Sequence, residues 1–100
     1  MSEYIFRSNG NYLGFISNGY LFSRDGEYLG WVEDKFVWYS NGQFSGEVTE
    51  INNKKYILRN IFLIPPISKV PRVQPVSPIL PLPPANAIPI NLLIGFKDAF

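Results

Sequence analysis

Three consecutive stretches of the chain decide its fold: YIFRSNGNYLGFISNG (residues 4–19), YLFSRDGEYLGWVEDK (residues 20–35) and FVWYSNGQFSGEVTEI (residues 36–51). Each opens with an aromatic residue, carries Asn-Gly or Asp-Gly near its centre, and has a second glycine four residues later. Such a dipeptide between β-forming residues is typical of a hairpin, because Asn, Asp and Gly tolerate the positive φ of the turn. The repeat therefore predicts successive β-hairpins with a period of 16 residues.

The head of the protein is expected to be all-β. Its predicted strands span residues 4–8, 11–17, 20–24, 27–33, 36–40 and 43–49. Residues 56–60 (YILRN) resemble residues 4–8 (YIFRS) and indicate the start of a fourth unit, whose second half has diverged into IFLIPPI. No segment has the 3.6-residue apolar period of a helix. The prediction is a head of four pseudo-repeated hairpins over residues 1–62, with essentially no helix.

The length of the hairpin turn decides which side chains share a face, and two arrangements are open. A two-residue loop groups Tyr4, Phe6, Leu13 and Phe15. A three-residue loop with a glycine bulge groups Tyr4, Phe6, Tyr12 and Ile16. Unit three is more polar, since Ser45 and Glu47 replace Leu13 and Phe15, so one face of its hairpin is expected to be wetter.

The second glycine of each unit forms a column at Gly14, Gly30 and Gly46. Glycine inside a strand marks a bulge or a close approach of another backbone. The simpler interpretation is packing between neighbouring hairpins. The functional alternative is a floor on which a ligand stacks, and it requires exposed aromatic rings.

The composition changes after residue 63, where Pro becomes abundant. Every third residue from Ile61 to Ile88 is apolar, and the next register is a series of prolines from Pro66 to Pro84 that only Lys69 and Arg72 interrupt. Polyproline II has three residues per turn, so one edge of such a helix would be a continuous aliphatic stripe. We therefore predict that residues 63–100 form an extended polyproline II arm docked along that edge. The candidate assembly stripe consists of Ile64, Ile67, Val70, Val73, Val76, Ile79, Leu82 and Ile88.

The arm is long relative to the head. Twenty-eight residues of polyproline II span about 85 Å, whereas a head of some 60 residues is about 25–30 Å across. The arm must bend around its own head, pack on other subunits or reach a partner, so docking in cis and in trans both stay open. The apolar end of the chain is the expected anchor: Leu92, Leu93, Ile94, Phe96 and Phe100. Residues 72–78 also fit the pattern bound by SH3-type grooves, which suggests a protein partner for the arm.

The composition contains little of the chemistry that enzymes use. The chain has 100 residues, no His, no Cys and a net charge of +1. Without His the serines have no partner to activate them, and the balanced charge argues against nucleic-acid binding. The carboxylate pairs Asp25 with Glu27 and Glu33 with Asp34 are expected to be solvated turn charges. We predict no catalytic residues, no cofactor and no metal site.

Location and membrane contact follow from the absence of apolar segments. The longest uninterrupted apolar stretch spans residues 61–66, far below the ~20 residues needed to cross a bilayer. No apolar run near the N-terminus suggests an export signal. The expectation is a cytoplasmic protein without membrane contact.

The aromatic residues of the hairpins raise a binding alternative. If exposed, Tyr12, Trp31, Trp38 and Tyr39 could stack on a glycan or cage a quaternary amine. Hairpin repeats of choline-binding modules look superficially similar, but their spacing and export signal are missing here.

The order of these features resembles the bacterial four-fold β-flower proteins. The resemblance is carried by SNGNYLGFI, RDGEYLGWV and SNGQFSGEV, then KYILRN, IPPI and VPRV, and then the proline-rich tail. It implies four hairpin petals around a pseudo-four-fold axis, and it implies no site residues. Petal four departs from the pattern, since it lacks the Asn-Gly turn and the glycine column.

These observations predict a non-enzymatic structural or interaction protein. We expect a homo-oligomer held partly by the proline-rich arm. The alternative is a small-ligand, glycan or quaternary-amine binding module that uses the aromatic-lined petals.

Overall fold

The computed structural model describes residues 3–100 of the protein. Within that range it contains β-strands and no helix, so the all-β prediction is confirmed. The strands are β1 (Glu3–Phe6), β2 (Tyr12–Ser17), β3 (Tyr20–Ser23), β4 (Tyr28–Glu33), β5 (Phe36–Tyr39), β6 (Phe44–Ile51), β7 (Lys54–Asn60) and β8 (Phe96–Asp98). The first six lie within two residues of the strands that the repeat predicts.

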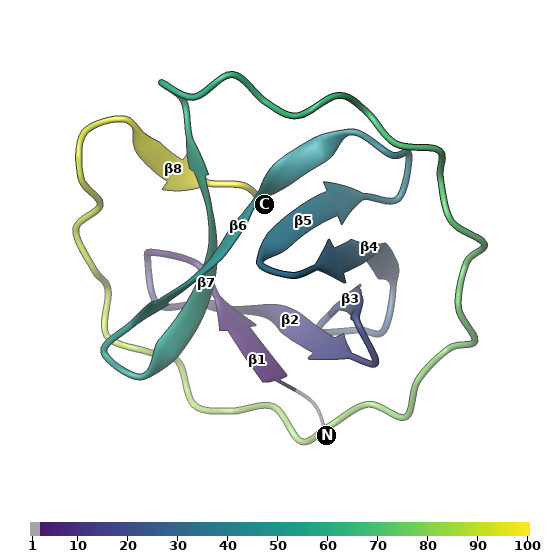
Figure 1. Ribbon diagram of the computed structural model, residues 1–100. Helices are drawn as coiled ribbons and strands as arrows, with labels where there is room; N and C mark the ends of the chain where they lie inside the picture. The colour runs from purple at the N-terminus through teal and green to yellow at the C-terminus, as the bar shows by residue number, and fades with distance from the viewer. Residues whose placement is uncertain (1–2) are drawn as a thin grey trace.

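The sheet closes on itself. Each strand from β1 to β7 is antiparallel to the next, and β1 also pairs with β7 in parallel, Ile5 opposite Lys55 and Phe6 opposite Tyr56. The result is a closed barrel of seven strands, to which β8 is added outside on β7 (Figure 1). Closure removes the exposed edge that β1 would otherwise present.

Strand β8 is a pairing that the repeat did not predict. The diverged residues 61–67 form no strand, and the partner of β7 comes instead from the end of the chain, where Asp98 lies opposite Leu58 and Phe96 opposite Asn60. More than thirty residues separate β7 from β8. Local spacing cannot predict such a pairing, because it depends on where the arm returns.

The turn of the first hairpin is the three-residue loop with a glycine bulge, one of the two predicted alternatives. The loop has three residues, with Gly10 at φ +92° and the Arg7 amide donating to the Asn11 carbonyl at 2.9 Å. The pairing of β1 with β2 also shifts by one residue. Tyr4 lies opposite Phe15, but Phe6, two residues later, lies opposite Tyr12 rather than Leu13. The shared face therefore holds Tyr4, Phe6, Tyr12 and Phe15, and neither predicted set is correct. The same register shift recurs in the β3–β4 and β5–β6 hairpins.

The register shift leaves Leu13 as an extra residue in β2, and the side chains on the two faces of the strands form two groups. Aliphatic side chains form one buried cluster, consisting of Ile5, Leu13, Ile16, Leu21, Val37 and Ile57. Aromatic rings gather on the opposite face of the strands, where Phe6, Tyr12 and Tyr56 pack with Leu58. Burial of these apolar surfaces is the main stabilising contribution to the barrel.

The second glycine column is explained by packing between hairpins. A Cβ added to Gly14 would lie 2.0 Å from the carbonyl oxygen of Phe22, and one on Gly30 would lie 1.9 Å from that of Trp38. At Gly46 the nearest atom is the carbonyl oxygen of Leu58, at 2.5 Å. In each case the first strand of the next hairpin passes directly over the glycine, so the predicted close backbone approach is confirmed.

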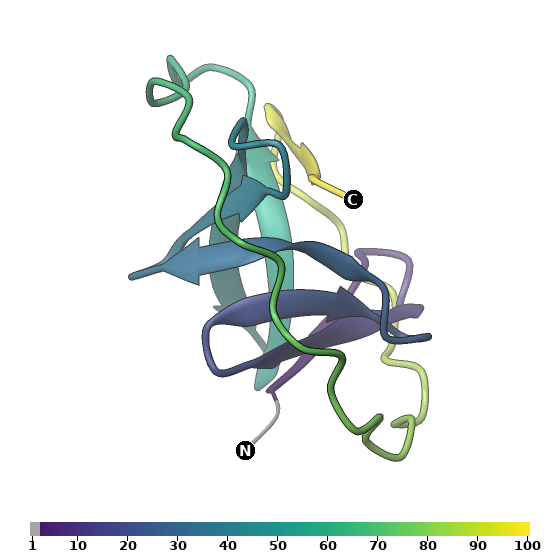
Figure 2. The ribbon, with the colours of Figure 1, turned by 90° about the vertical axis from the view of Figure 1, so that its right-hand side faces the viewer.

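The arm circles the head of its own chain (Figures 1 and 2). It contacts the tips of the hairpins in reverse order. The Lys69 amide donates to the Gly42 carbonyl at 2.8 Å, and the Ala87 amide donates to the Gly10 carbonyl at 2.8 Å. Between them, Leu80 packs against Gly26. The turn glycines thus leave room for the arm as well as forming the turns.

Candidate functional site

One contact region between the arm and the head is built on two tryptophans. Trp31 on β4 and Trp38 on β5 are cross-strand partners whose rings stack 6.5 Å apart at 18°. Trp31 is 0% exposed and Trp38 is 3% exposed. Stacked pairs of this kind add about 0.5–1.5 kcal/mol beyond their buried area.

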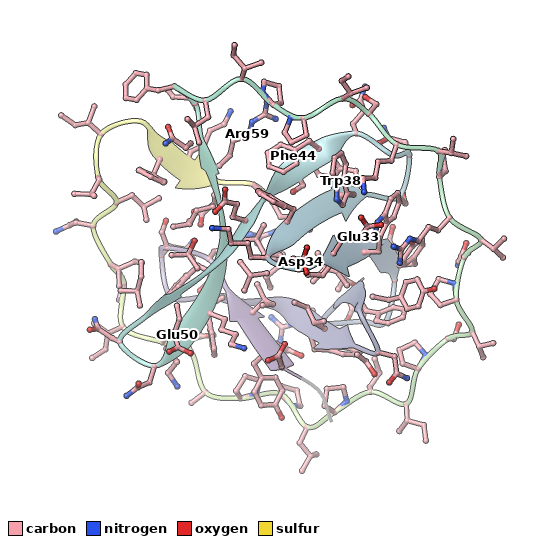
Figure 3. All side chains as sticks on the ribbon, viewed as in Figure 1. Glu33, Asp34, Trp38, Phe44, Glu50 and Arg59 are labelled. Carbon is pink, nitrogen blue, oxygen red and sulfur yellow. The ribbon has the colours of Figure 1, made fainter. Side chains whose placement is uncertain are left out.

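Two cations of the arm cover these rings. The Lys69 Nζ lies 4.9 Å from the centroid of Trp38, and the Arg72 guanidinium carbon lies 5.1 Å from that of Trp31. Both cations also form ion pairs with Glu33, whose carboxylate accepts a hydrogen bond from the Trp31 indole at 3.2 Å. Glu33 and Trp38 lie close together in Figure 3. We call Trp31, Glu33, Trp38, Lys69 and Arg72 the arm clamp.

The electrostatics of the clamp favour the charged form of its acid. The hydrogen bond from Lys69 lowers the pKa of Glu33 below its usual value, and Arg72 and Trp31 contribute in the same direction. Partial desolvation opposes this effect. Glu33 is therefore an ionised partner of two cations, in contrast to the solvated turn charge that the sequence suggested.

The candidate ligand-stacking residues are not gathered into one exposed platform. Only Trp31 and Trp38 stack on each other, and Lys69 and Arg72 cover both rings. Tyr12 is buried beside Phe6. Tyr39 is half-buried, and its hydroxyl donates to the Ala99 carbonyl at 2.7 Å. The exposed rings that the binding alternative requires are absent at Tyr12, Trp31 and Trp38.

The aliphatic stripe faces away from the head. Its members are 85–95% exposed: Ile64, Ile67, Val70, Val73, Val76, Ile79, Leu82 and Ile88. This edge therefore does not dock on the chain's own head, which was one of the two arrangements left open. The neighbouring register faces inward instead, and its half-buried members are Pro75, Pro78, Pro81, Pro84, Ala87 and Ile90. The cations of this register, Lys69 and Arg72, meet aromatic rings of the head in cation–π contacts.

The C-terminal anchor is only partly as predicted. Phe100 packs edge-on against the Tyr39 ring at 5.1 Å, and Leu92 packs on the aromatic cluster. Phe96 in β8 is 37% exposed, and Leu93 and Ile94 are 77% and 90% exposed, so these three are not buried against their own head. The turn before β8 projects Leu93 and Ile94 outward.

Polar contacts that sequence reasoning missed hold the end of the chain. The Asp98 carboxylate accepts hydrogen bonds from the amide and the hydroxyl of Ser8, at 2.9 and 2.6 Å. The Arg7 side chain donates to the Phe100 carbonyl at 3.1 Å. No local pattern relates residues 90 or more positions apart. Lys69 and Arg72, by contrast, had a signal, since they interrupt the prolines in the inward register.

Two further observations apply to residues 3–100. No helix in this range is long and apolar enough to cross a membrane. No group of three or more His, Cys, Asp or Glu side chains lies close enough together there to hold a metal ion.

The protein is an all-β protein. Its short hairpins form a closed seven-stranded barrel, and its own arm circles this barrel. The sequence matches the 4-fold beta flower protein family over residues 1–91, so the chain belongs to this family. The resemblance noted from the repeats is thereby confirmed. Comparison with curated proteins and with solved structures found no match.

Proposed function

We propose that this protein is a non-enzymatic assembly protein that self-associates through the aliphatic stripe of its arm. The observation that carries the proposal is the exposure of the stripe. Eight large aliphatic side chains point outward at every third position and are 85–95% exposed. A continuous exposed apolar surface of this kind is typical of an interaction site.

The arrangement of the arm supports association in trans. Contacts with the head use the inward register and the backbone of the arm, as at Lys69 and Ala87. The stripe is therefore left free for another molecule. The protein measures 35 × 35 × 18 Å, and the arm circles the head in Figure 1, with side chains projecting outward along it in Figure 3. Contacts between stripes would join molecules edge to edge.

The expected strength of such a contact is modest. Burying one aliphatic side chain contributes about 1.5–3 kcal/mol. A contact that half-covers four stripe residues on each of two copies gives about 6–12 kcal/mol, against an association cost of about 4–15 kcal/mol. Association is therefore expected to be reversible and to depend on protein concentration.

Light scattering of the full chain tests the proposal. We expect the molar mass of the wild type to rise with concentration. The double variant Val73→Lys/Val76→Lys should stay monomeric, because it places two charges in the stripe. The control Gln74→Lys/Ser77→Lys adds the same charge at exposed positions of the same arm outside the stripe, and should associate like the wild type. A wild type that stays monomeric up to millimolar concentration refutes the proposal.

A further inference from the structure

The junctions between successive hairpins are equivalent by register, and two of them are filled by stacked rings. Phe15 lies opposite Phe22, and their rings stack 5.5 Å apart at 27°. Trp31 lies opposite Trp38 in the same way at the next junction. In both cases the first residue of the pair follows a glycine of the second column.

The third junction has no ring pair. Here the residue after Gly46 is Glu47, and it lies opposite Leu58. A carboxylate and an isobutyl group occupy less of this space than two stacked aromatic rings. The missing rings leave a space at this junction that the other two junctions do not have.

A pocket of about 370 Å³ lies at this position. Glu47 and Leu58 both line it, Phe36, Phe44 and Phe96 supply aromatic walls, and Pro65 of the arm also lines it. The volume falls within the range of about 300–1,000 Å³ that is typical of small-molecule sites.

The walls of the pocket are held in place by packing. The ring of Phe44 meets that of Phe36 edge-on at 6.0 Å and that of Trp38 at 5.4 Å. The guanidinium of Arg59 lies 5.8 Å from the Phe44 centroid, on a ring that Figure 3 places beside it. The pocket is therefore preformed rather than dependent on a large rearrangement.

The charge of the pocket selects the ligand. Among the described residues that line it, Glu47 is the only charged one. Its carboxylate is 3.8 Å from the Lys35 Nζ, and the Lys35 side chain is 66% exposed. An exposed pair of this kind contributes little, so a ligand cation can take the place of Lys35.

We propose that this pocket binds a small planar aromatic amine. The aromatic ring lies in the space that stacked rings occupy at the other two junctions, and the protonated amine pairs with the Glu47 carboxylate. An aromatic ligand that carries a carboxylate is disfavoured by repulsion from Glu47. This site is separate from the rings of Trp31 and Trp38, which Lys69 and Arg72 cover.

The test is an NMR titration of the full chain with tryptamine, and with indole-3-propionate as the probe of opposite charge. Saturable shifts are expected for the backbone amides of Gly46, Leu58 and Phe96 on addition of tryptamine. Indole-3-propionate should bind at least about tenfold more weakly, because a hydrogen-bonded charge pair is replaced by repulsion. No saturable shift with millimolar tryptamine, or equal binding of both probes, overturns the proposal.

Three variants assign the binding to this pocket. Glu47→Gln keeps the shape and removes the charge, and should weaken tryptamine binding about tenfold. Glu50→Gln removes a carboxylate of the same strand outside the pocket lining, and should bind like the wild type. Glu47→Phe restores a ring at the junction and should abolish binding. If Glu47→Phe does not fold, the comparison of Glu47→Gln with Glu50→Gln decides, and equal affinities overturn the proposal. The assembly variants at Val73 and Val76 lie outside this pocket, so the two proposals fail independently.

Discussion

The side chain of Ser45 offers a sharp test of how the hairpins pack. It is fully buried, and its hydroxyl has no hydrogen-bond partner among the residues that the structure describes. Units one and two carry Leu13 and Leu29 at the same place. A buried hydroxyl without a partner is destabilising, so Ser45→Ala should increase the free energy of unfolding.

The size of the effect can be worked out from the site. An unsatisfied buried hydroxyl costs about 1–3 kcal/mol. Removing the oxygen also removes its packing contacts, each about 0.1–0.2 kcal/mol, which offsets part of the gain. We expect a net increase of about 1 kcal/mol, equivalent to a rise in Tm of about 4–8 °C for a domain of this size.

Urea unfolding and calorimetry at low protein concentration provide the assay. Low concentration keeps self-association from contributing to the apparent stability. Ser40→Ala is the matched control, because Ser40 is exposed and its replacement should change stability by less than about 0.5 kcal/mol. A decrease in stability for Ser45→Ala would refute the reasoning, since it would mean that the hydroxyl makes a stabilising hydrogen bond.

Two further predictions concern the hairpin packing and the arm clamp. Gly30→Ala should lower the free energy of unfolding by at least about 2 kcal/mol, because its Cβ would lie 1.9 Å from the Trp38 carbonyl oxygen. Urea unfolding measures this change, and an unchanged unfolding midpoint contradicts the prediction. The lowered pKa of Glu33 means that its contribution to arm docking is complete above about pH 4.3 and is lost as the pH falls through the lower folded-state pKa. The protection factor of the Lys69 amide, which is the exchange rate of an unfolded peptide divided by that of the folded protein at the same pH, should therefore fall at acid pH in the wild type. In Glu33→Gln this protection factor should be lower already at neutral pH and show no such acid step, and identical profiles would disprove the role of Glu33.

Local features of the fold were predictable from the sequence, and long-range ones were not. The hairpins follow from turn chemistry and alternation, which act within a few residues. Which side chains face the core depends on Leu13, the extra residue of a bulge in β2. No spacing rule distinguishes this bulge from regular pairing. Strand β8 pairs across the whole arm, so its place depends on tertiary packing.

The candidate site illustrates the same division. The three-residue period grouped arm residues that are all 85–95% exposed, but a period does not say which edge faces the head. The polar substitutions of unit three were visible, and a wetter face was expected there. In fact Ser45 is buried, whereas Glu47 is half-exposed at a pocket. Which of the two meets water was decided by the bulge.

The bond between Ser8 and Asp98 has a consequence for the order of folding, because it joins positions 90 residues apart. The hairpins form from neighbouring segments and are expected to fold fast, whereas contacts between the two ends of the chain must wait for the closure of a long loop. Docking of the arm should then be the last and slowest event. Trp31 and Trp38 lie under that arm, so the late phase of their fluorescence would follow arm docking in real time.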